Sequence, residues 1–193
     1  MEKNRIRSSR GDAMQELKIV QDLKKQLEWF NINKQFSTIL ILCIGTNKVV
    51  GDSIGPMVGE SLLKLLKYKQ NVKIYGSMKE PLSFANTKQV LKEILIKYKQ
   101  PFIITIDAAL GKEEMIERII VGRGNIKIGA SLGRDASCNS HINIKAVVGK
   151  YKNDKMENFN TLINTDLKMV KKRAECFWGA QYQFEHAKGV VRS

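Results

Sequence analysis

The amino-acid sequence predicts an α/β domain with a mainly parallel central sheet. Two short segments, TILILCI at residues 38–44 and FIITID at residues 102–107, are almost continuously aliphatic or β-branched, which is typical of strands buried on both faces. Segments with helical periodicity lie between such runs, as at residues 53–67. Strands that alternate with helices form right-handed βαβ units, so we expect neighbouring strands to run parallel.

The predicted elements follow one another in a regular order along the chain. We expect helices over residues 14–30, 53–67, 86–99 and 155–175, and strands over residues 38–44, 72–77, 102–107, 117–122 and 141–148. Asn86 or Thr87 is the expected N-cap of the third helix. If the sheet follows the common order 2-1-3-4-5, the first and third strands are neighbours beside the switch in strand order.

Length and composition fit one folded domain. The chain has 193 residues, of which 43% are hydrophobic and 27% are charged, as in an ordinary globular protein. We expect an N-terminal helical extension at residues 1–35, a single α/β domain at residues 36–175 and a C-terminal tail at residues 176–193.

The cysteines and apolar runs indicate the cellular compartment. Cys43, Cys138 and Cys176 are too scattered for a disulfide framework, which favours a reducing, intracellular environment. The apolar runs are too short to span a membrane, and no apolar core follows the basic N-terminus. We therefore expect a cytoplasmic protein without a membrane partner.

The net charge of +14 raises the question of a nucleic-acid partner. The positive excess is spread along the whole chain, whereas a dedicated binding arm or stripe would concentrate it. The charge therefore does not favour nucleic acid over solvated surfaces.

A glycine-rich turn, CIGTNKVVGDSIGPMVG, follows the first predicted strand. Five residues separate Gly45 from Gly51, and Asp52 stands where a phosphate-binding loop needs lysine. Asn47 replaces the second glycine of a dinucleotide fingerprint, and a carboxylate would repel phosphate. Both nucleotide interpretations fail on their defining residues.

Two aspartates, Asp52 in this turn and Asp107 at the end of the third predicted strand, are the candidate functional residues. In the order 2-1-3-4-5 they would face one crevice at the carboxyl ends of the strands. Each also has a structural interpretation, since Asp52 could cap the helix at 53–67 and Asp107 could cap the next turn.

Four segments carry a resemblance to a known family. They are CIGTNKVVGDSIGPMVG, YGSMKEPLSFAN, PFIITIDAALG and GASLGR. Over residues 36–175 the chain resembles the YyaC-type sporulation proteins of endospore-forming bacteria. These are similar to the germination protease and, more remotely, to hydrogenase maturation endopeptidases. The resemblance implies a three-layer α/β/α sandwich of the phosphorylase/hydrolase type, and a location in the forespore or spore interior. It also implies a protein or peptide substrate such as a spore protein.

The resemblance also implies roles for residues. The germination protease places its proposed catalytic pair at positions that match Asp52 and Asp107. In hydrogenase maturation endopeptidases, similar acids bind a metal with a histidine, for which His141 is the candidate. His141 begins a predicted strand, at the wrong end of a parallel sheet, so we expect neither metal nor cofactor. The spacing Cys138-x-x-His141 is only a weak signal for a metal or a thiol nucleophile.

The sequence-based hypothesis is a sporulation-associated endopeptidase. Two carboxylates in a crevice repel each other, so Asp52 and Asp107 can hold one proton near neutral pH and serve as interchangeable acid and base. The expected substrate-binding residues are Gly45, Gly51, Gly55, Glu80 and Arg134. Glycines let a substrate backbone approach, Glu80 would shape the crevice unless it is a solvated loop acid, and Arg134 would contact substrate.

Several alternatives stay open at this point. The chain could be a non-catalytic sporulation factor that binds a peptide or protein partner in the same crevice, because folds host several functions. The N-terminal helix could cover the sheet, occlude the crevice or contact another subunit.

Overall fold

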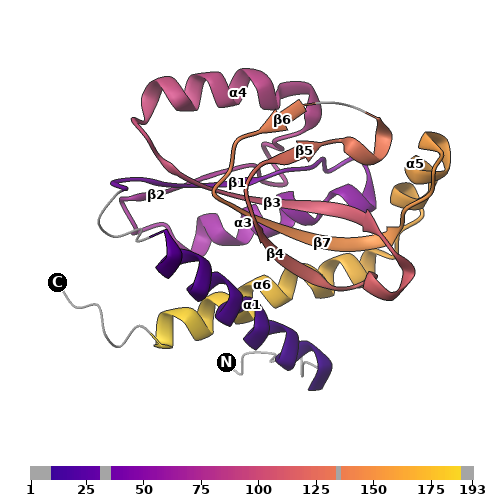
Figure 1. The fold of residues 1–193 in the computed structure, drawn as a ribbon, viewed down its shortest axis with the longest axis horizontal. Coiled ribbons are helices and arrows are strands. Elements are labelled where there is room, and N and C mark those ends of the chain that lie inside the picture. Colours follow the sequence, from indigo (N-terminus) through magenta and orange to yellow (C-terminus); the bar gives the residue numbers. More distant parts are fainter. Residues whose placement is uncertain (1–9, 31–35, 134–135, 188–193) are drawn as a thin grey trace.

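The computed structural model describes residues 10–30, 36–133 and 136–187. Its centre is a five-stranded sheet in the order β2-β1-β3-β7-β4 (Figure 1). Four strands are parallel neighbours, namely β2 (Val72–Tyr75), β1 (Ile39–Cys43), β3 (Phe102–Gly111) and β7 (Ile142–Lys150). The fifth, β4 (Ile119–Arg123), pairs antiparallel with β7. The predicted mainly parallel α/β sheet is therefore confirmed.

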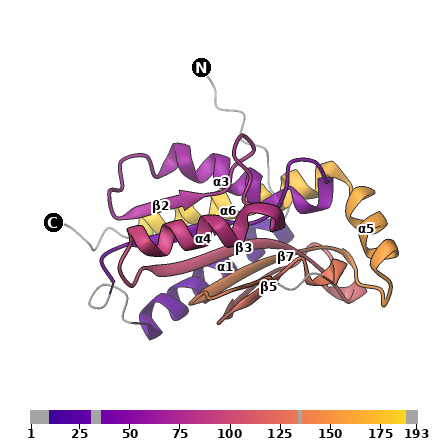
Figure 2. The same cartoon turned by 90° about the horizontal axis from the view of Figure 1, so that it is seen from above.

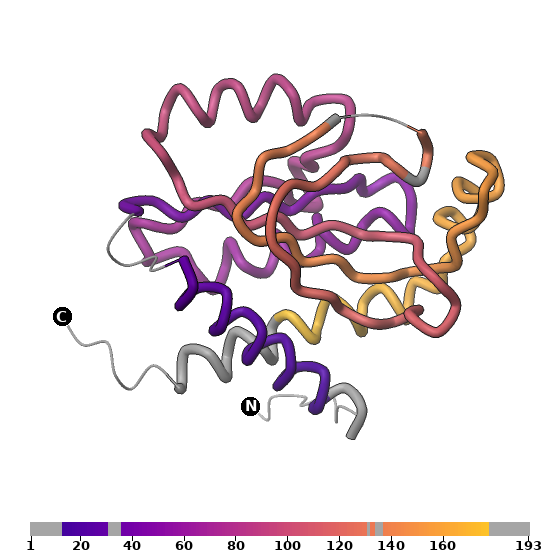
Figure 3. Tube along the Cα trace, viewed as in Figure 1, coloured from indigo at the N-terminus to yellow at the C-terminus, as the bar shows by residue number. Residues whose placement is uncertain are grey.

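The last two strands exchange the places that the order 2-1-3-4-5 gives them. Only residues 112–118, with a short 3₁₀ turn at Glu113–Met115 (η2), connect β3 to β4, as Figure 3 shows. A parallel crossover needs a dozen or more residues, so the chain turns back into an antiparallel strand. Because β7 is buried along most of its length and β4 is not, β7 takes the inner position.

Different elements cover the two faces of the sheet (Figure 2). Helices α1 (Arg10–Trp29), α3 (Ile54–Leu65) and α6 (Leu167–Ala187) pack on one face and share its apolar core. The other face carries α4 (Phe84–Lys97) and a small antiparallel sheet of β5 (Ile126–Ile128) and β6 (Ala136–Cys138). The result is a three-layer sandwich in which one outer layer combines a helix with a β-hairpin.

The N-terminal helix covers the sheet. Its Ile19 is buried, and its Gln15 donates to the carbonyl of Glu117 at 3.1 Å. Arg173 of α6 donates to Gln15 and to the carbonyl of Glu117, and pairs with the Glu117 carboxylate at 3.6 Å. These contacts hold α1 against α6, on the face opposite α4 and the β5–β6 hairpin.

The C-terminal part differs from the predicted single helix over 155–175. Helix α5 (Lys155–Ile163) is separate from α6, because the Asp166 side chain accepts from the backbone N–H of Lys168 at 2.8 Å and starts a new helix there. The expected tail at 176–193 includes helix as far as Ala187, with Cys176 in the core.

The N-cap of α4 lies three residues before Asn86, the first of the two residues predicted for that role. Ser83 is the N-cap, and Asn86 closes a capping box by accepting from the Ser83 N–H at 2.9 Å. None of the described helices combines the length and apolarity needed to cross a lipid bilayer.

Candidate active site

The glycine-rich turn after β1 folds back on itself. At its start, Gly45 donates to the carbonyl of Leu82 at 2.9 Å, and Thr46 donates to the carbonyl of Asp52 at 3.0 Å. Gly45 has a φ of 140°, and a Cβ there would lie 2.0 Å from the Asp52 carbonyl oxygen. Glycine is therefore required at this position, and the closed turn returns Asp52 to the end of β1.

Asp52 does not cap helix α3. It ends a 3₁₀ turn at Val50–Asp52 (η1), and the N-cap of α3 is Ser53, whose hydroxyl donates to the Val50 carbonyl at 2.7 Å. The half-buried Asp52 lines two adjoining cavities at the carboxyl ends of the strands.

Asp107 lies on β3 at the level where β1 ends. The sequence predicted a strand that ends at Asp107, but β3 continues to Gly111. Cys43, the last residue of β1, is the register partner of Ile106. Because Ile106 faces the core beneath α1, α3 and α6, Asp107 faces the side of α4 and the hairpin. Its side chain is buried and lines a cavity together with Asp52.

The environment of Asp107 favours its protonated form. Burial raises the pKa of its carboxyl well above the usual value, and the charge of Asp52 raises it further. The backbone N–H of Ala108 and the Lys145 ammonium act in the opposite direction and lower this pKa. Because Asp52 and Asp107 line the same cavity, the fold brings together two carboxylates that are far apart in the sequence.

Lys145 is a site residue that the sequence analysis missed. It is the register partner of Asp107 on the neighbouring parallel strand β7, so both side chains lie on the same face of the sheet. Lys145 is half-buried and lines the cavity of the aspartates, as does Lys127 of β5. The signal was a lysine inside the apolar segment INIKAVV, where a charge needs a partner.

The aspartate cavity, as we call this space, has a volume of about 330 Å³. Its walls come from separate parts of the fold. They include the residues that follow β1, the turn that carries Asp52, the second half of β3, the hairpin and β7. The first residue of α4, the loop between β7 and α5, and α5 itself complete them. Such a position, outside the carboxyl ends of parallel strands, is where open α/β sheets bind ligands.

The predicted turn glycines have different roles. Gly45 lines the aspartate cavity, but Gly51 and Gly55 face protein. A Cβ on Gly55 would lie 2.0 Å from the Ile44 carbonyl oxygen, and one on Gly51 would lie 2.6 Å from Oγ1 of Thr165. The prediction that these two glycines make room for substrate is therefore wrong. They make room for close packing.

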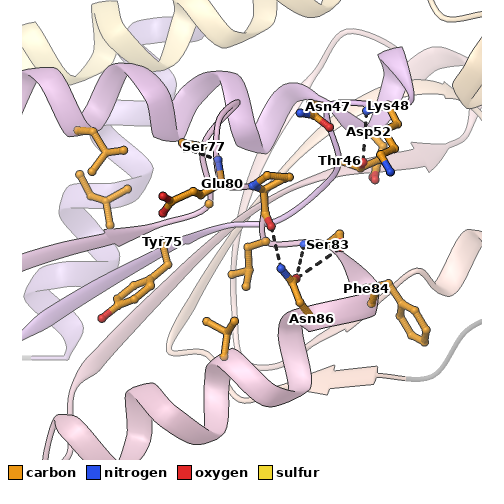
Figure 4. A pocket seen from close by; sticks show the side chains of 17 residues that line it. Thr46, Asn47, Lys48, Asp52, Tyr75, Ser77, Glu80, Ser83, Phe84 and Asn86 are labelled. Carbon is orange, nitrogen blue, oxygen red and sulfur yellow. Dashed lines mark hydrogen bonds between the residues drawn. The ribbon is translucent and has the colours of Figure 1, made fainter.

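Glu80 lies outside the aspartate cavity. It is exposed on the loop after β2 and lines an adjoining cavity of about 810 Å³ (Figure 4). The Ser77 hydroxyl accepts from the Glu80 N–H at 3.0 Å, and Asn47 donates across the cavity rim to the Met78 carbonyl at 2.9 Å. Arg134, the other predicted substrate contact, lies outside the described residues.

His141 lies at the opposite end of the sheet from Asp107. It lies just before β7 and precedes Lys145 by four residues, a separation of about 13 Å in an extended chain. Its Nδ1 accepts from the Ile103 N–H at 3.0 Å, and its ring stacks on Phe102 with centroids 4.6 Å apart. The alternative metal site of Asp52, Asp107 and His141 is thus wrong.

The remaining groups at the site do not fit a metal either. Lys145, the register partner of Asp107, lines the same cavity, and its positive charge would repel a metal ion there. Within the described part of the chain, no three His, Cys, Asp or Glu side chains form a group that could hold an ion. Cys138 is buried, which raises the pKa of its thiol to about 11 and opposes a nucleophilic role.

The comparison with solved structures found hydrogenase maturation proteases. The crystal structure of the [NiFe] hydrogenase maturation protease HycI from Thermococcus kodakarensis KOD1 has a TM-score of 0.51 and 19% sequence identity, covering 82% of this chain and 97% of that one. The protease HybD from Thermococcus kodakarensis has a TM-score of 0.40 and 13% identity, with coverages of 78% and 99%. The likeness to HycI shows a shared fold.

The sequence itself identifies the family. Residues 12–178 match the family described as "Protein of unknown function (DUF1256)", and the chain belongs to this family. A relative from Bacillus subtilis (strain 168), "Uncharacterized protein YyaC", is 32% identical over 140 residues, which are 71% of this chain and 66% of the relative. The match thus spans just under two thirds of that relative, and the predicted YyaC-type resemblance is confirmed.

Proposed function

We propose that this protein is an endopeptidase in which Asp52 and Asp107 hydrolyse a peptide bond by acid–base chemistry. The observation that carries the proposal is a buried carboxyl, Asp107, whose pKa is raised by burial and by Asp52 across a shared cavity. Aspartates with a structural role are held by helix caps or ion pairs that lower their pKa. Two neighbouring carboxyls whose pKa values are pushed apart are typical of acid–base sites.

The two aspartates differ in their surroundings, which assigns them different roles. Buried Asp107 keeps its proton and donates a hydrogen bond to the carbonyl oxygen of the scissile peptide. Half-buried Asp52 accepts a proton from the water that attacks the carbonyl carbon. When the tetrahedral intermediate collapses, the C–N bond breaks and the amine nitrogen receives the proton held by Asp52, giving one new carboxyl and one new amine.

Lys145 supports this cycle from the neighbouring strand. Its ammonium lowers the pKa of Asp107 by Coulomb attraction, which opposes the effects of burial and of Asp52. A carboxyl acid is most effective when its pKa lies near the working pH. In this proposal Lys145 is a positioning residue that limits the rise in the pKa of Asp107, so that the Asp107 proton is a stronger hydrogen-bond donor to the carbonyl oxygen.

The test is cleavage of a library of unstructured peptides by the full-length protein, read by mass spectrometry. We expect Asp52→Asn and Asp107→Asn each to reduce cleavage by about a hundredfold or more, with unchanged circular dichroism. Asp154→Asn is the matched control, because Asp154 caps α5 and lines neither of the cavities that Asp52 lines, and asparagine caps equally well. Cleavage that survives both site substitutions would exclude the aspartate mechanism.

The same variants test the alternative of a non-catalytic sporulation factor. A binding factor would show no cleavage by the native chain, and would retain a peptide or protein partner when both aspartates are neutralised. The endopeptidase proposal requires turnover by the native protein.

The association with sporulation is a further part of the proposal and rests on the YyaC-type resemblance. In this proposal the substrate is a spore protein, and the enzyme is located in the forespore or the spore interior. A fluorescent fusion followed through sporulation in Bacillus subtilis tests it. Fluorescence confined to the forespore is expected, and an even signal in the mother cell would contradict it.

A further inference from the structure

Three cavities adjoin one another along the carboxyl ends of the parallel strands. The cavity of about 810 Å³ beside β2, here the β2-side cavity, shares Asp52 and Phe84 with the aspartate cavity. A third cavity of about 560 Å³, here the β7-side cavity, shares Leu110 and Tyr151 with it. The aspartates therefore lie in the middle of a longer cleft with a cavity on each side.

An aromatic side chain stands at each junction of this cleft. Phe84, the first residue of α4, is 36% exposed, and Tyr151, just after β7, is 51% exposed. Figure 4 shows Phe84 at one end of the β2-side cavity, beyond Ser83 and Asn86. Partly exposed aromatic rings at the two junctions offer apolar contact area on either side of the reacting bond.

The charges along the cleft suit a polypeptide better than a polyanion. The β2-side cavity is lined by both a cation, Lys48, and an anion, Glu80, so their charges offset each other. In the β7-side cavity, Lys150 pairs with Glu113 at 2.8 Å. Nucleic acid requires an excess of cations along its path, and neither flank supplies one. Other polar side chains labelled in Figure 4, such as Ser77, Ser83 and Asn86, are uncharged and add no attraction for a polyanion.

The dimensions also fit an extended chain. The path from β2 to β7 crosses three strand spacings, about 14 Å, which an extended peptide spans with about four residues. We propose that the three cavities form one substrate cleft that binds an internal, extended segment of an unfolded polypeptide, with Phe84 and Tyr151 as its contacts on the two sides of the aspartates. This inference rests on the proposed function and names its substrate class.

The experiment measures binding separately from cleavage. Full-length Asp107→Asn protein is titrated against fluorescein-labelled lactalbumin that has been reduced and carboxymethylated, an unfolded probe, with anisotropy as the readout. Adding Phe84→Ala or Tyr151→Ala is expected to weaken binding by about tenfold. Tyr68→Ala is the matched control, since Tyr68 is 86% exposed on the turn between α3 and β2 and lies outside the cleft.

Competition with peptides blocked at both ends tests the length of the cleft. Blocked peptides of about eight residues are expected to displace the probe, and blocked dipeptides are not. Unchanged binding in both aromatic variants, no binding of the probe, or equal competition by short and long peptides would each overturn the cleft. If the aromatic variants weaken binding but native protein cleaves nothing, the cleft stands and the peptidase proposal fails. Phe84→Leu and Tyr151→Leu serve as second variants if either alanine variant fails to fold.

Discussion

Asp107 and Lys145 are direct register partners on the adjacent parallel strands β3 and β7, and both line the aspartate cavity. The pair joins a carboxyl whose pKa is raised by burial to an ammonium that lowers that pKa. Asp52 adds a second carboxylate to the same space. The protonation of Asp107 thus depends on a balance: burial and the negative charge of Asp52 raise its pKa, and the positive charge of Lys145 lowers it.

Replacing Lys145 by methionine is expected to raise the pKa of Asp107 further, because the attraction from the ammonium is lost while burial and Asp52 remain. Carbon-13 NMR titration of the Asp107 carboxyl measures this directly, and the pH profile of peptide cleavage should move in the same direction. Lys145→Arg keeps the positive charge and is the control. A titration of Asp107 that is identical in the methionine variant would refute the coupling.

Asp107→Asn is expected to stabilise the fold at neutral pH. The pKa of Asp107 is raised on folding, so the folded state binds the proton more tightly than the unfolded chain, and stability falls as pH rises from the usual aspartate pKa to the folded one. Each unit of displacement corresponds to about 1.4 kcal/mol. Urea unfolding should show little difference between variant and native protein at about pH 3, and a more stable variant at about pH 8.

An aspartate with a structural role should behave in the opposite way. The carboxylate of Asp154 accepts from the Glu157 N–H at 2.8 Å at the start of α5. Asp154→Ala is therefore expected to destabilise the protein by about 1 kcal/mol at neutral pH. If Asp107→Asn destabilised the protein as well, Asp107 would be a structural residue and the site would lose its main support.

The arrangement of Asp52 and Asp107 follows from features visible in the sequence. The apolar runs before each aspartate identify β1 and β3, and the connections between them are long enough for parallel crossovers. Together with the common strand order 2-1-3-4-5, these facts place both aspartates near the carboxyl ends of adjacent strands. The position of Lys145 did not follow, because it depends on β7 lying beside β3, and pairing between distant strands leaves no local signal.

The glycines show a second limit of sequence reasoning. A glycine-rich turn has the same appearance whether its open space receives substrate or protein. In the fold, Gly55 of α3 lies against the backbone of Ile44 at the end of β1. The requirement for glycine there comes from a helix packed closely on a strand, a contact that only the folded structure reveals.

Gly55→Ala is therefore expected to affect stability and not substrate recognition. The added Cβ would lie 2.0 Å from the Ile44 carbonyl oxygen, and backbone on both sides leaves little room to move. We expect a loss of about 3 kcal/mol in the free energy of unfolding, measured in urea. Gly124→Ala is the comparison, since no atom lies within 4 Å of its Cβ and its φ of 87° leaves only backbone strain of about 1–2 kcal/mol. An equal or smaller loss at Gly55 would contradict the packing role.

His141 should make the fold sensitive to acid independently of the aspartates. Burial lowers the pKa of its imidazole, whose Nδ1 accepts from the Ile103 N–H. The unfolded chain then binds a proton that the folded state resists, so stability is lost as pH falls below the ordinary histidine pKa of about 6.5. His141→Asn keeps an acceptor near the Nδ1 position and removes the titration, so its stability should fall less than that of the native protein between about pH 8 and about pH 5.

Peptide cleavage should not depend on added metal in the native protein or in His141→Asn, since His141 lies about 13 Å from the level of Asp107 along the strand direction. A loss of cleavage in His141→Asn that added zinc or nickel restores would overturn this separation of the imidazole from the active site.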